Sequence, residues 1–203
     1  MEAGSGKVSF MLLKDISATT KISICNRTWS NSSNQFTGDY SVDDIWTWSP
    51  GEALTNGDHF ILDSDGQIIR VNGDVQEVVG NTSHDHTGKA AESSDADFDL
   101  SNNGDGILFF QADPFELSTD GDAGLWVTGI HTGLGWGQGG GNSYSELPTA
   151  LTNGVNANHV GEKHDYGVYT GALSGTESEL RASINKSSNW LFSEDTEYNL
   201  EIQ

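Results

Sequence analysis

Short apolar runs separated by turn-forming residues recur along this chain about every ten residues, and this spacing limits the folds open to it. Within segments such as 21–25 and 45–48, apolar and polar residues alternate, which is the period of a strand with one buried face. The runs end at turn signals such as Ser49-Pro-Gly and Asp63-Ser-Asp-Gly. We therefore predict an all-β fold, a β-sandwich of many short antiparallel strands.

One segment near the C-terminus has a helical pattern instead. Thr176-Glu-Ser-Glu is a capping box, and Leu180 and Ile184 follow with the four-residue spacing of one helix face. The pattern predicts a single short helix at about residues 176–186.

The length of 203 residues suits one domain, which we place at 1–203. Residues 1–7 are expected to form a flexible N-terminal segment. The polar stretch 80–96 and the glycine-rich stretch 133–145 are expected to be long loops. A hydrophobic content of 34% with six Trp argues for a folded chain despite a mean hydropathy of -0.45.

The charge balance excludes some partners. Nine Lys and Arg stand against 30 Asp and Glu, a formal net charge of -21 that repels phosphate backbones and anionic headgroups. We therefore expect no nucleic-acid partner and no membrane insertion, since no stretch approaches the roughly 20 apolar residues of a membrane helix. The first residues also lack a basic segment followed by an apolar one, so no classical signal peptide is predicted.

The aromatic residues and the single cysteine are assigned mainly to the interior. Trp46 and Trp48 share one strand face and are predicted to pack between sheets. Cys25 lies on the strand face opposite Ile22 and Ile24, and we expect a buried structural thiol. Within the glycine-rich loop, Trp136 and Gln138 are the candidates for surface contact.

Several acidic turns and one histidine pair are candidate metal ligands. Calcium prefers six to eight oxygen ligands, which loops rich in Asp, Asn and Gly supply. His84 and His86 are two residues apart and can share a metal such as zinc, although the sequence shows no obvious further ligands. The same residues are also ordinary turn formers and solvated loop residues. The candidate ligands are Asp63, Asp65, Asp95, Asp97, Asp99, His84 and His86, with calcium as the cofactor to test.

No motif in the chain predicts catalysis. It has no Gly-x-Ser-x-Gly elbow, no His-Glu-x-x-His and no phosphate-binding glycine loop with its lysine. Carboxylate pairs are too frequent here to identify a glycosidase. We expect a protein that is not an enzyme, with no catalytic residues; a calcium-dependent hydrolase is the enzymatic alternative.

A longer set of motifs resembles a known module. In chain order these are Val8-Ser-Phe-Met-Leu-Leu-Lys-Asp-Ile, Cys25-Asn-Arg-Thr-Trp29, Ile45-Trp-Thr-Trp-Ser-Pro-Gly, Asp97-Phe-Asp-Leu-Ser-Asn-Asn-Gly-Asp-Gly-Ile-Leu-Phe-Phe-Gln, Glu146-Leu-Pro-Thr-Ala-Leu-Thr-Asn-Gly-Val-Asn-Ala, Gly161-Glu, Tyr166-Gly-Val-Tyr-Thr-Gly, Gly175-Thr-Glu-Ser-Glu-Leu and Ser188-Asn-Trp190. Their order is similar to that of a β-sandwich module of large bacterial surface and secreted proteins, itself similar to lamin-tail-like domains. The resemblance implies a non-catalytic domain that decorates or attaches.

Two functions from different classes remain after these exclusions. The first is a structural surface-display protein, most plausibly a capsid decoration protein on a virion surface, whose partners are copies of itself or of a capsid or surface lattice. A strongly negative surface keeps such a protein soluble. The second is a secreted or cell-surface adhesion or carbohydrate-binding module with a glycan partner, stabilised by calcium.

Overall fold

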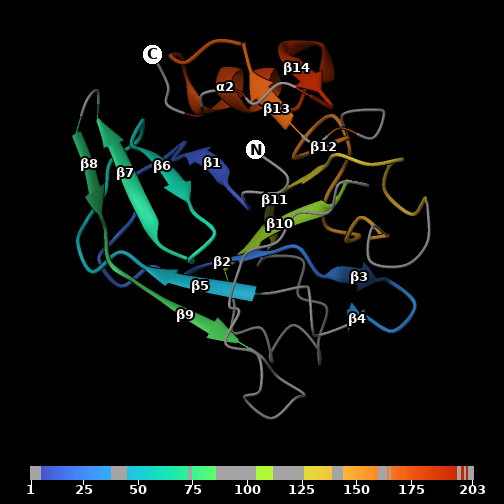
Figure 1. Ribbon diagram of the computed structural model, residues 1–203, viewed down its shortest axis with the longest axis horizontal. Helices are drawn as coiled ribbons and strands as arrows, with labels where there is room; N and C mark the ends of the chain where they lie inside the picture. Colours follow the sequence, from blue (N-terminus) through green and yellow to red (C-terminus); the bar gives the residue numbers. More distant parts are fainter. Residues whose placement is uncertain are drawn as a thin grey trace.

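The computed structural model describes residues 6–37, 45–72, 75–85, 104–111, 126–138, 144–159, 164, 166–195, 198 and 200. Two main sheets form the body of the molecule (Figure 1). The smaller sheet has the order β1-β6-β7-β8, with β1 at Val8–Met11, β6 at His59–Leu62, β7 at Ile68–Asn72 and β8 at Val75–Val78. The larger has the order β12-β11-β10-β2-β5-β9, with β12 at Ala157–His159, β11 at Trp126–His131, β10 at Gly106–Phe110, β2 at Ile22–Cys25, β5 at Ile45–Ser49 and β9 at Asn81–Asp85.

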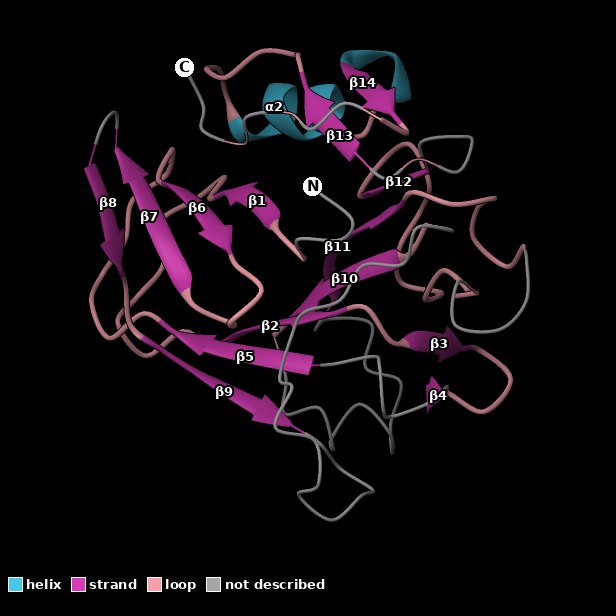
Figure 2. Ribbon diagram, in the orientation of Figure 1, coloured by secondary structure: helices cyan, strands magenta, loops and turns pink. Residues whose placement is uncertain are grey.

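Two further strand pairs and two short helices complete the described structure (Figure 2). They are β3 at Thr28–Ser30 with β4 at Gln35–Thr37, β13 at Tyr166–Tyr169 with β14 at Trp190–Ser193, the α-helix α2 at Glu177–Ile184 and the 3-10 turn η2 at Ser187–Asn189. The predicted all-β fold with one short C-terminal α-helix is confirmed. No helix of the described residues is long and apolar enough to cross a membrane.

Two details of strand pairing differ from the sequence-based expectation. The strand pair β11–β12 is parallel, whereas the other pairs of named strands are antiparallel. The predicted loop 80–96 begins with a strand, because Asn81–Asp85 pairs along the whole of β5 as β9. Its polar sequence has no apolar alternation, so the hydrogen-bond ladder with a neighbouring strand, and not hydropathy, makes it a strand.

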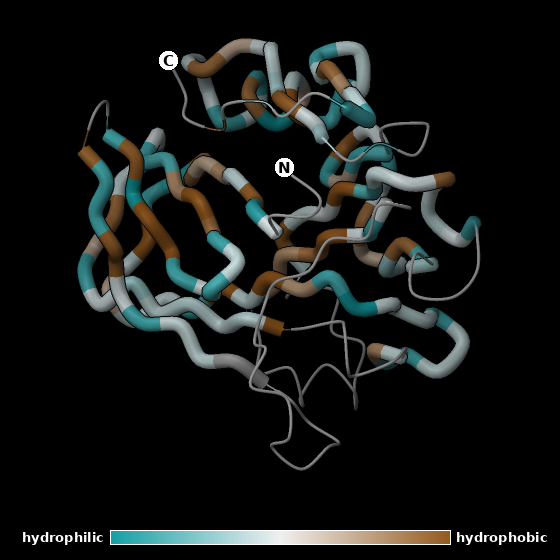
Figure 3. Tube along the Cα trace, in the orientation of Figure 1, coloured by the Kyte–Doolittle hydropathy of each residue, from teal (hydrophilic) through white to brown (hydrophobic). Residues whose placement is uncertain are grey.

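The larger sheet has an apolar core on each face. On β2, Ile22 and Ile24 contribute to the first core, between the two sheets, while Cys25 contributes to the second. On β10, Ile107 and Phe109 face the first core and Leu108 and Phe110 the second. The β10 sequence Ile107–Phe110 is a continuous apolar run, because both faces of this strand are covered. Figure 3 shows the same apolar stretches along the strands of both sheets.

Trp46 and Trp48 lie together in the first core, as their shared strand face predicts. Trp48 is fully buried, and its Nε1–H donates a hydrogen bond to the Val79 carbonyl at 2.8 Å. Val79 lies between β8 of the smaller sheet and β9 of the larger sheet. The hydrogen bond therefore ties β5 to the connection between the two sheets.

The helix α2 begins as its sequence predicts. The Thr176 side chain accepts from the Glu179 backbone N–H, and the Glu179 side chain accepts from the Thr176 N–H, which completes the capping box. Leu180 is its buried residue. Together with β13, η2 and β14, the helix forms the C-terminal unit, residues 166–193, drawn above β1 and β12 in Figure 1.

Two buried amides attach the C-terminal unit to the sandwich. Asn185 Nδ2 donates to the Val155 carbonyl at 2.9 Å, and Asn158 Nδ2 donates to the Ile184 carbonyl at 3.2 Å. Both asparagines are buried. One bond is donated by the end of α2 and the other is donated by β12. The two bonds therefore attach the unit to the β12 region at two points.

Candidate functional site

The predicted metal ligands Asp63 and Asp65 lie in the turn between β6 and β7. Asp63 Oδ1 accepts the Gln67 backbone N–H at 2.7 Å, and the Asp63 carbonyl accepts the Gly66 N–H at 3.0 Å. Burial raises the pKa of Asp63, and the neighbouring Asp65 charge adds to that rise. These two hydrogen bonds close the turn. The described residues contain no group of three or more His, Cys, Asp or Glu that could hold a metal.

The remaining predicted ligands are not joined into a site by the described residues. The backbone of His84 lies on β9, opposite Trp46 of β5. His86, Asp95, Asp97 and Asp99 lie outside the described residues. Calcium and zinc binding therefore stay predictions of the sequence.

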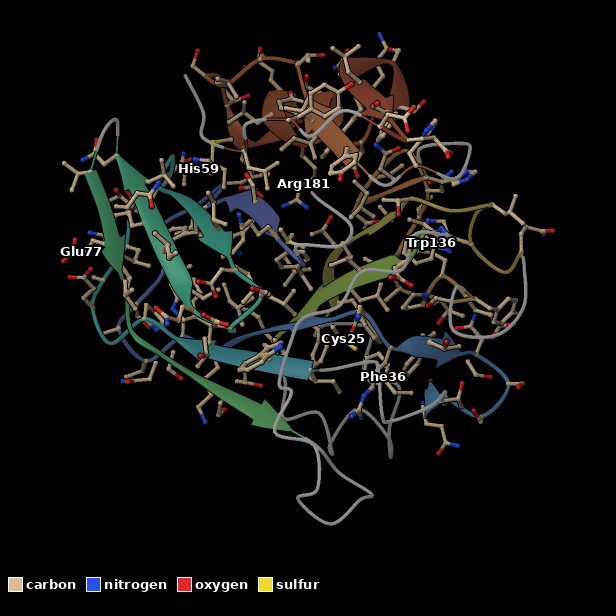
Figure 4. The ribbon with its side chains drawn as sticks, viewed as in Figure 1. Cys25, Phe36, His59, Glu77, Trp136 and Arg181 are labelled. Carbon is tan, nitrogen blue, oxygen red and sulfur yellow. The ribbon has the colours of Figure 1, made fainter. Side chains whose placement is uncertain are left out.

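The ring of Trp136 is half-buried and packs against the second core. A Cβ placed on Gly106 would lie 3.2 Å from its Cζ3 atom, and one on Gly129 would lie 3.1 Å from Cη2. The ring therefore rests on two glycines of neighbouring strands, and Figure 4 labels it beside β10 and β11. The ring is thus mainly a packing group, whereas Gln138, the other contact candidate, is exposed.

His131 and His159 hold the backbone of Gly133 between them. His131 is fully buried, and its Nδ1 accepts the Gly133 N–H at 3.0 Å. His159 Nε2 lies 3.2 Å from the Gly133 carbonyl, which is an acceptor, so this nitrogen donates. The two ring centroids are 6.1 Å apart. We call His131, Gly133 and His159 the histidine clamp.

The clamp positions the start of the glycine-rich stretch. Within the described parts of that stretch, 133–138 and 144–145, the chain forms turns and irregular structure but no strand. Gly135 lies against His159, because a Cβ there would be 2.9 Å from its Cε1 atom. The first turns of the stretch are thus fixed to the ends of β11 and β12, which leaves exposed side chains such as Leu134, at 54% exposure.

The burial of His131 decides the charge of its ring. Burial, together with a smaller effect of the neighbouring His159, lowers the pKa of His131 to about 4. His131 is therefore uncharged at neutral pH, and because Nδ1 accepts, its proton lies on Nε2. A histidine that binds a metal through Nε2 donates its Nδ1–H to an acceptor. His131 has the opposite arrangement, so the clamp does not suit a metal.

Sequence reasoning did not find the clamp. His131 ends β11 and His159 ends β12, and the two residues are opposite each other in the parallel pairing of these strands. A separation of 28 positions gives no local signal for this pairing. Gly135 was the available clue, since the close approach of the His159 ring to the backbone requires a residue without Cβ there.

Cys25 is the buried thiol that its strand position predicts. It is fully buried in the second core, and its Sγ accepts the Arg27 backbone N–H at 3.1 Å. A thiol enclosed in this way is not accessible to a substrate or an oxidant.

The C-terminal unit contains a row of half-buried aromatic rings. Phe192 is stacked on His164 at 5.3 Å and on Trp190 at 6.2 Å, with interplanar angles of 15° and 10°. Trp190 Nε1–H donates to the Ile184 carbonyl at 2.8 Å. Sugar platforms need an open ring face. The Phe192 ring has neighbours on two sides, so this row packs the unit and does not present such a platform at its centre.

Comparison with protein-family models, with curated proteins and with solved structures finds no match.

Proposed function

We propose that this protein is a non-catalytic structural protein of a particle surface, in the first place a virion surface, where it contacts other protein subunits. The proposal rests on the two-sheet body, on the net charge of the chain and on the exposed edge of the smaller sheet. The exposed edge is the main observation, because it predicts a contact that can be tested by mutation.

The charge supports display on a crowded surface. A net charge of -21 on 203 residues keeps closely spaced copies of a protein from sticking to one another or to nucleic acid. The apolar residues meanwhile fill two cores on either side of one sheet, so the body itself is a folded scaffold.

The strand β8 supports a protein–protein contact. It is the last strand of the smaller sheet in the described structure, and all four of its residues are exposed. Val75 is 63% exposed and Val78 is 55% exposed. Residues three apart on a strand point to opposite faces, so each side of the edge carries one exposed valine, Val75 beside Glu77 and Val78 beside Gln76. An exposed edge strand offers unpaired backbone N–H and C=O groups with which another chain can pair.

Fractionation of native source material on a density gradient tests the proposal, with intact-mass analysis of this chain in each fraction. Co-banding with nucleic-acid-filled particles is the expected result. Recovery in the free secreted or cell-envelope fraction would overturn the virion assignment and support the adhesion or carbohydrate-binding alternative.

A matched pair of variants tests the contact itself. Val78→Glu places a charge on the proposed edge, and Leu191→Glu places the same charge on β14, where the side chain is also 55% exposed. We expect Val78→Glu to reduce the amount of chain on purified particles at least about tenfold, which corresponds to about 1.4 kcal/mol of binding free energy, and Leu191→Glu to leave it unchanged. Equal incorporation of the two folded variants would remove β8 from the proposal.

A further inference from the structure

Two buried N–H donors next to the histidine clamp have no acceptor among the residues that the structure describes. The Nε2 of His131 and the Nε1 of Trp136 are both buried, and neither has a hydrogen-bond partner among the described residues. The two rings are in T-shaped contact, with centroids 5.1 Å apart. Both donors therefore belong to one region of the molecule, below the glycine-rich stretch.

The chemistry of each nitrogen is fixed by its surroundings. Trp Nε1 can only donate a hydrogen bond. His131 Nδ1 already accepts from Gly133, so Nε2 carries the proton of the neutral ring and is also a donor. The region thus presents two donors, and folding is opposed by every buried donor that is left without an acceptor.

The kind of acceptor follows from the charge and the space. An anion is disfavoured by the net charge of -21 and finds no cation in the neutral His131 ring. A metal ion is excluded by the two protons. Both rings and Ser145 pack closely around Gly106, where a Cβ would lie 3.0 Å from Ser145 Cβ, 3.2 Å from Trp136 Cζ3 and 3.4 Å from His131 Cδ2. A water molecule accepts hydrogen bonds without bringing a charge, and proteins hold buried water at polar groups that otherwise lack partners.

We infer that the donors of His131 and Trp136 bond to ordered water held beneath the glycine-rich stretch, and that this water is an integral part of the fold. The water completes the hydrogen bonding of the His131 ring and of the Trp136 ring. The water site goes beyond the proposed function and does not depend on it.

Nuclear magnetic resonance on the ¹⁵N-labelled full chain at neutral pH tests this inference. In ¹⁵N-edited NOESY and ROESY spectra, we expect the Trp136 indole N–H to show cross-peaks to water whose signs are those of a long-lived bound molecule. The chain supplies its own controls: the indole N–H groups of Trp48 and Trp190 donate to the Val79 and Ile184 carbonyls at 2.8 Å. These two indoles should show no such cross-peak. Trp136→Phe identifies the signal by its loss.

Two results would overturn the inference. A Trp136 indole without a water cross-peak, in a spectrum where the controls behave as expected, would mean that the donor is unpaired or bonded to the chain. A ¹H–¹⁵N correlation spectrum with the His131 proton on Nδ1 would mean that Nε2 is not a donor. The expected spectrum instead has the proton on Nε2, and that result supports the site.

Discussion

Gly66 occupies a position between β6 and β7 where two separate constraints exclude a side chain. Its φ of +75° is in the left-handed region, which residues with a Cβ adopt only at a cost. A Cβ there would also lie 2.3 Å from the Trp46 ring, inside the first core. The glycine therefore closes the turn and lets a core indole lie directly against the backbone.

A comparison with Gly51 separates these two constraints. Gly51 has a φ of +73°, but no atom lies within 4 Å of its Cβ position. We expect Gly51→Ala to lower the free energy of unfolding by about 1–2 kcal/mol, the cost of the backbone conformation. Gly66→Ala should lower it by a further 1–3 kcal/mol or so, because the core must also accommodate an extra methyl group.

Urea denaturation of the two variants measures both effects. A similar loss of stability for Gly51→Ala and Gly66→Ala would contradict the close approach of Trp46 to this turn. The unsubstituted chain gives the reference in the same experiment.

At the scale of the elements, the C-terminal unit depends on a few polar contacts. Its helix has one buried residue, Leu180, which is little apolar burial for an eight-residue helix. The position of the unit therefore relies on the reciprocal bonds of Asn158 and Asn185 across to the sandwich. Asn185 also ends the helix, since its Nδ2 donates to the Arg181 carbonyl at 2.9 Å.

Asn185→Ala is expected to loosen this unit from the body of the protein. The substitution leaves the Val155 and Arg181 carbonyls without this donor, at a cost of about 1–3 kcal/mol. Hydrogen exchange of the backbone amides of α2 should become at least about fivefold faster, a change of about 1 kcal/mol. The neighbouring exposed Lys186→Ala is the control and should leave exchange nearly unchanged. Unchanged protection of α2 in Asn185→Ala would show that other contacts hold the unit.

At the scale of the whole molecule, two buried histidines make stability depend on pH. Burial lowers the pKa of both His59 and His131 to about 4. In the unfolded chain a histidine titrates near 6.5. Between these values the unfolded state binds more protons than the folded state, so stability falls as the pH falls from about 6.5 to about 4. Above about pH 6.5 this contribution is constant.

We expect the free energy of unfolding to fall by about 3 kcal/mol per histidine across this range. The raised pKa of Asp63 acts in the opposite direction, because the folded state then holds its proton more tightly. His59→Gln keeps a polar side chain beside Ser9, whose Oγ lies 2.7 Å from His59 Nε2, and should remove about half of the slope. Chemical denaturation at several pH values measures this, and a flat profile between pH 6.5 and 4.5 would contradict the buried neutral histidines.

Sequence patterns predicted those features whose causes are local. The alternation in 21–25 assigned Ile22 and Ile24 to one face and Cys25 to the other, because successive side chains of a strand point to opposite sides. The capping box placed the start of α2, because its bonds join residues three apart. The position of Trp136 in a glycine-rich stretch predicted surface contact, which stays a prediction, whereas its packing on Gly106 and Gly129 had no local signal.

The pairing of distant strands was decided only by the tertiary structure. Nothing in the polar segment Asn81–Asp85 indicates a strand until β5 lies beside it, and nothing between β11 and β12 indicates a parallel pair. The histidine clamp depends on that pairing, since it brings together residues 28 positions apart. Hydrophobic alternation and caps are local properties that a sequence determines by itself, whereas partners across a sheet are chosen by the packing of the whole chain.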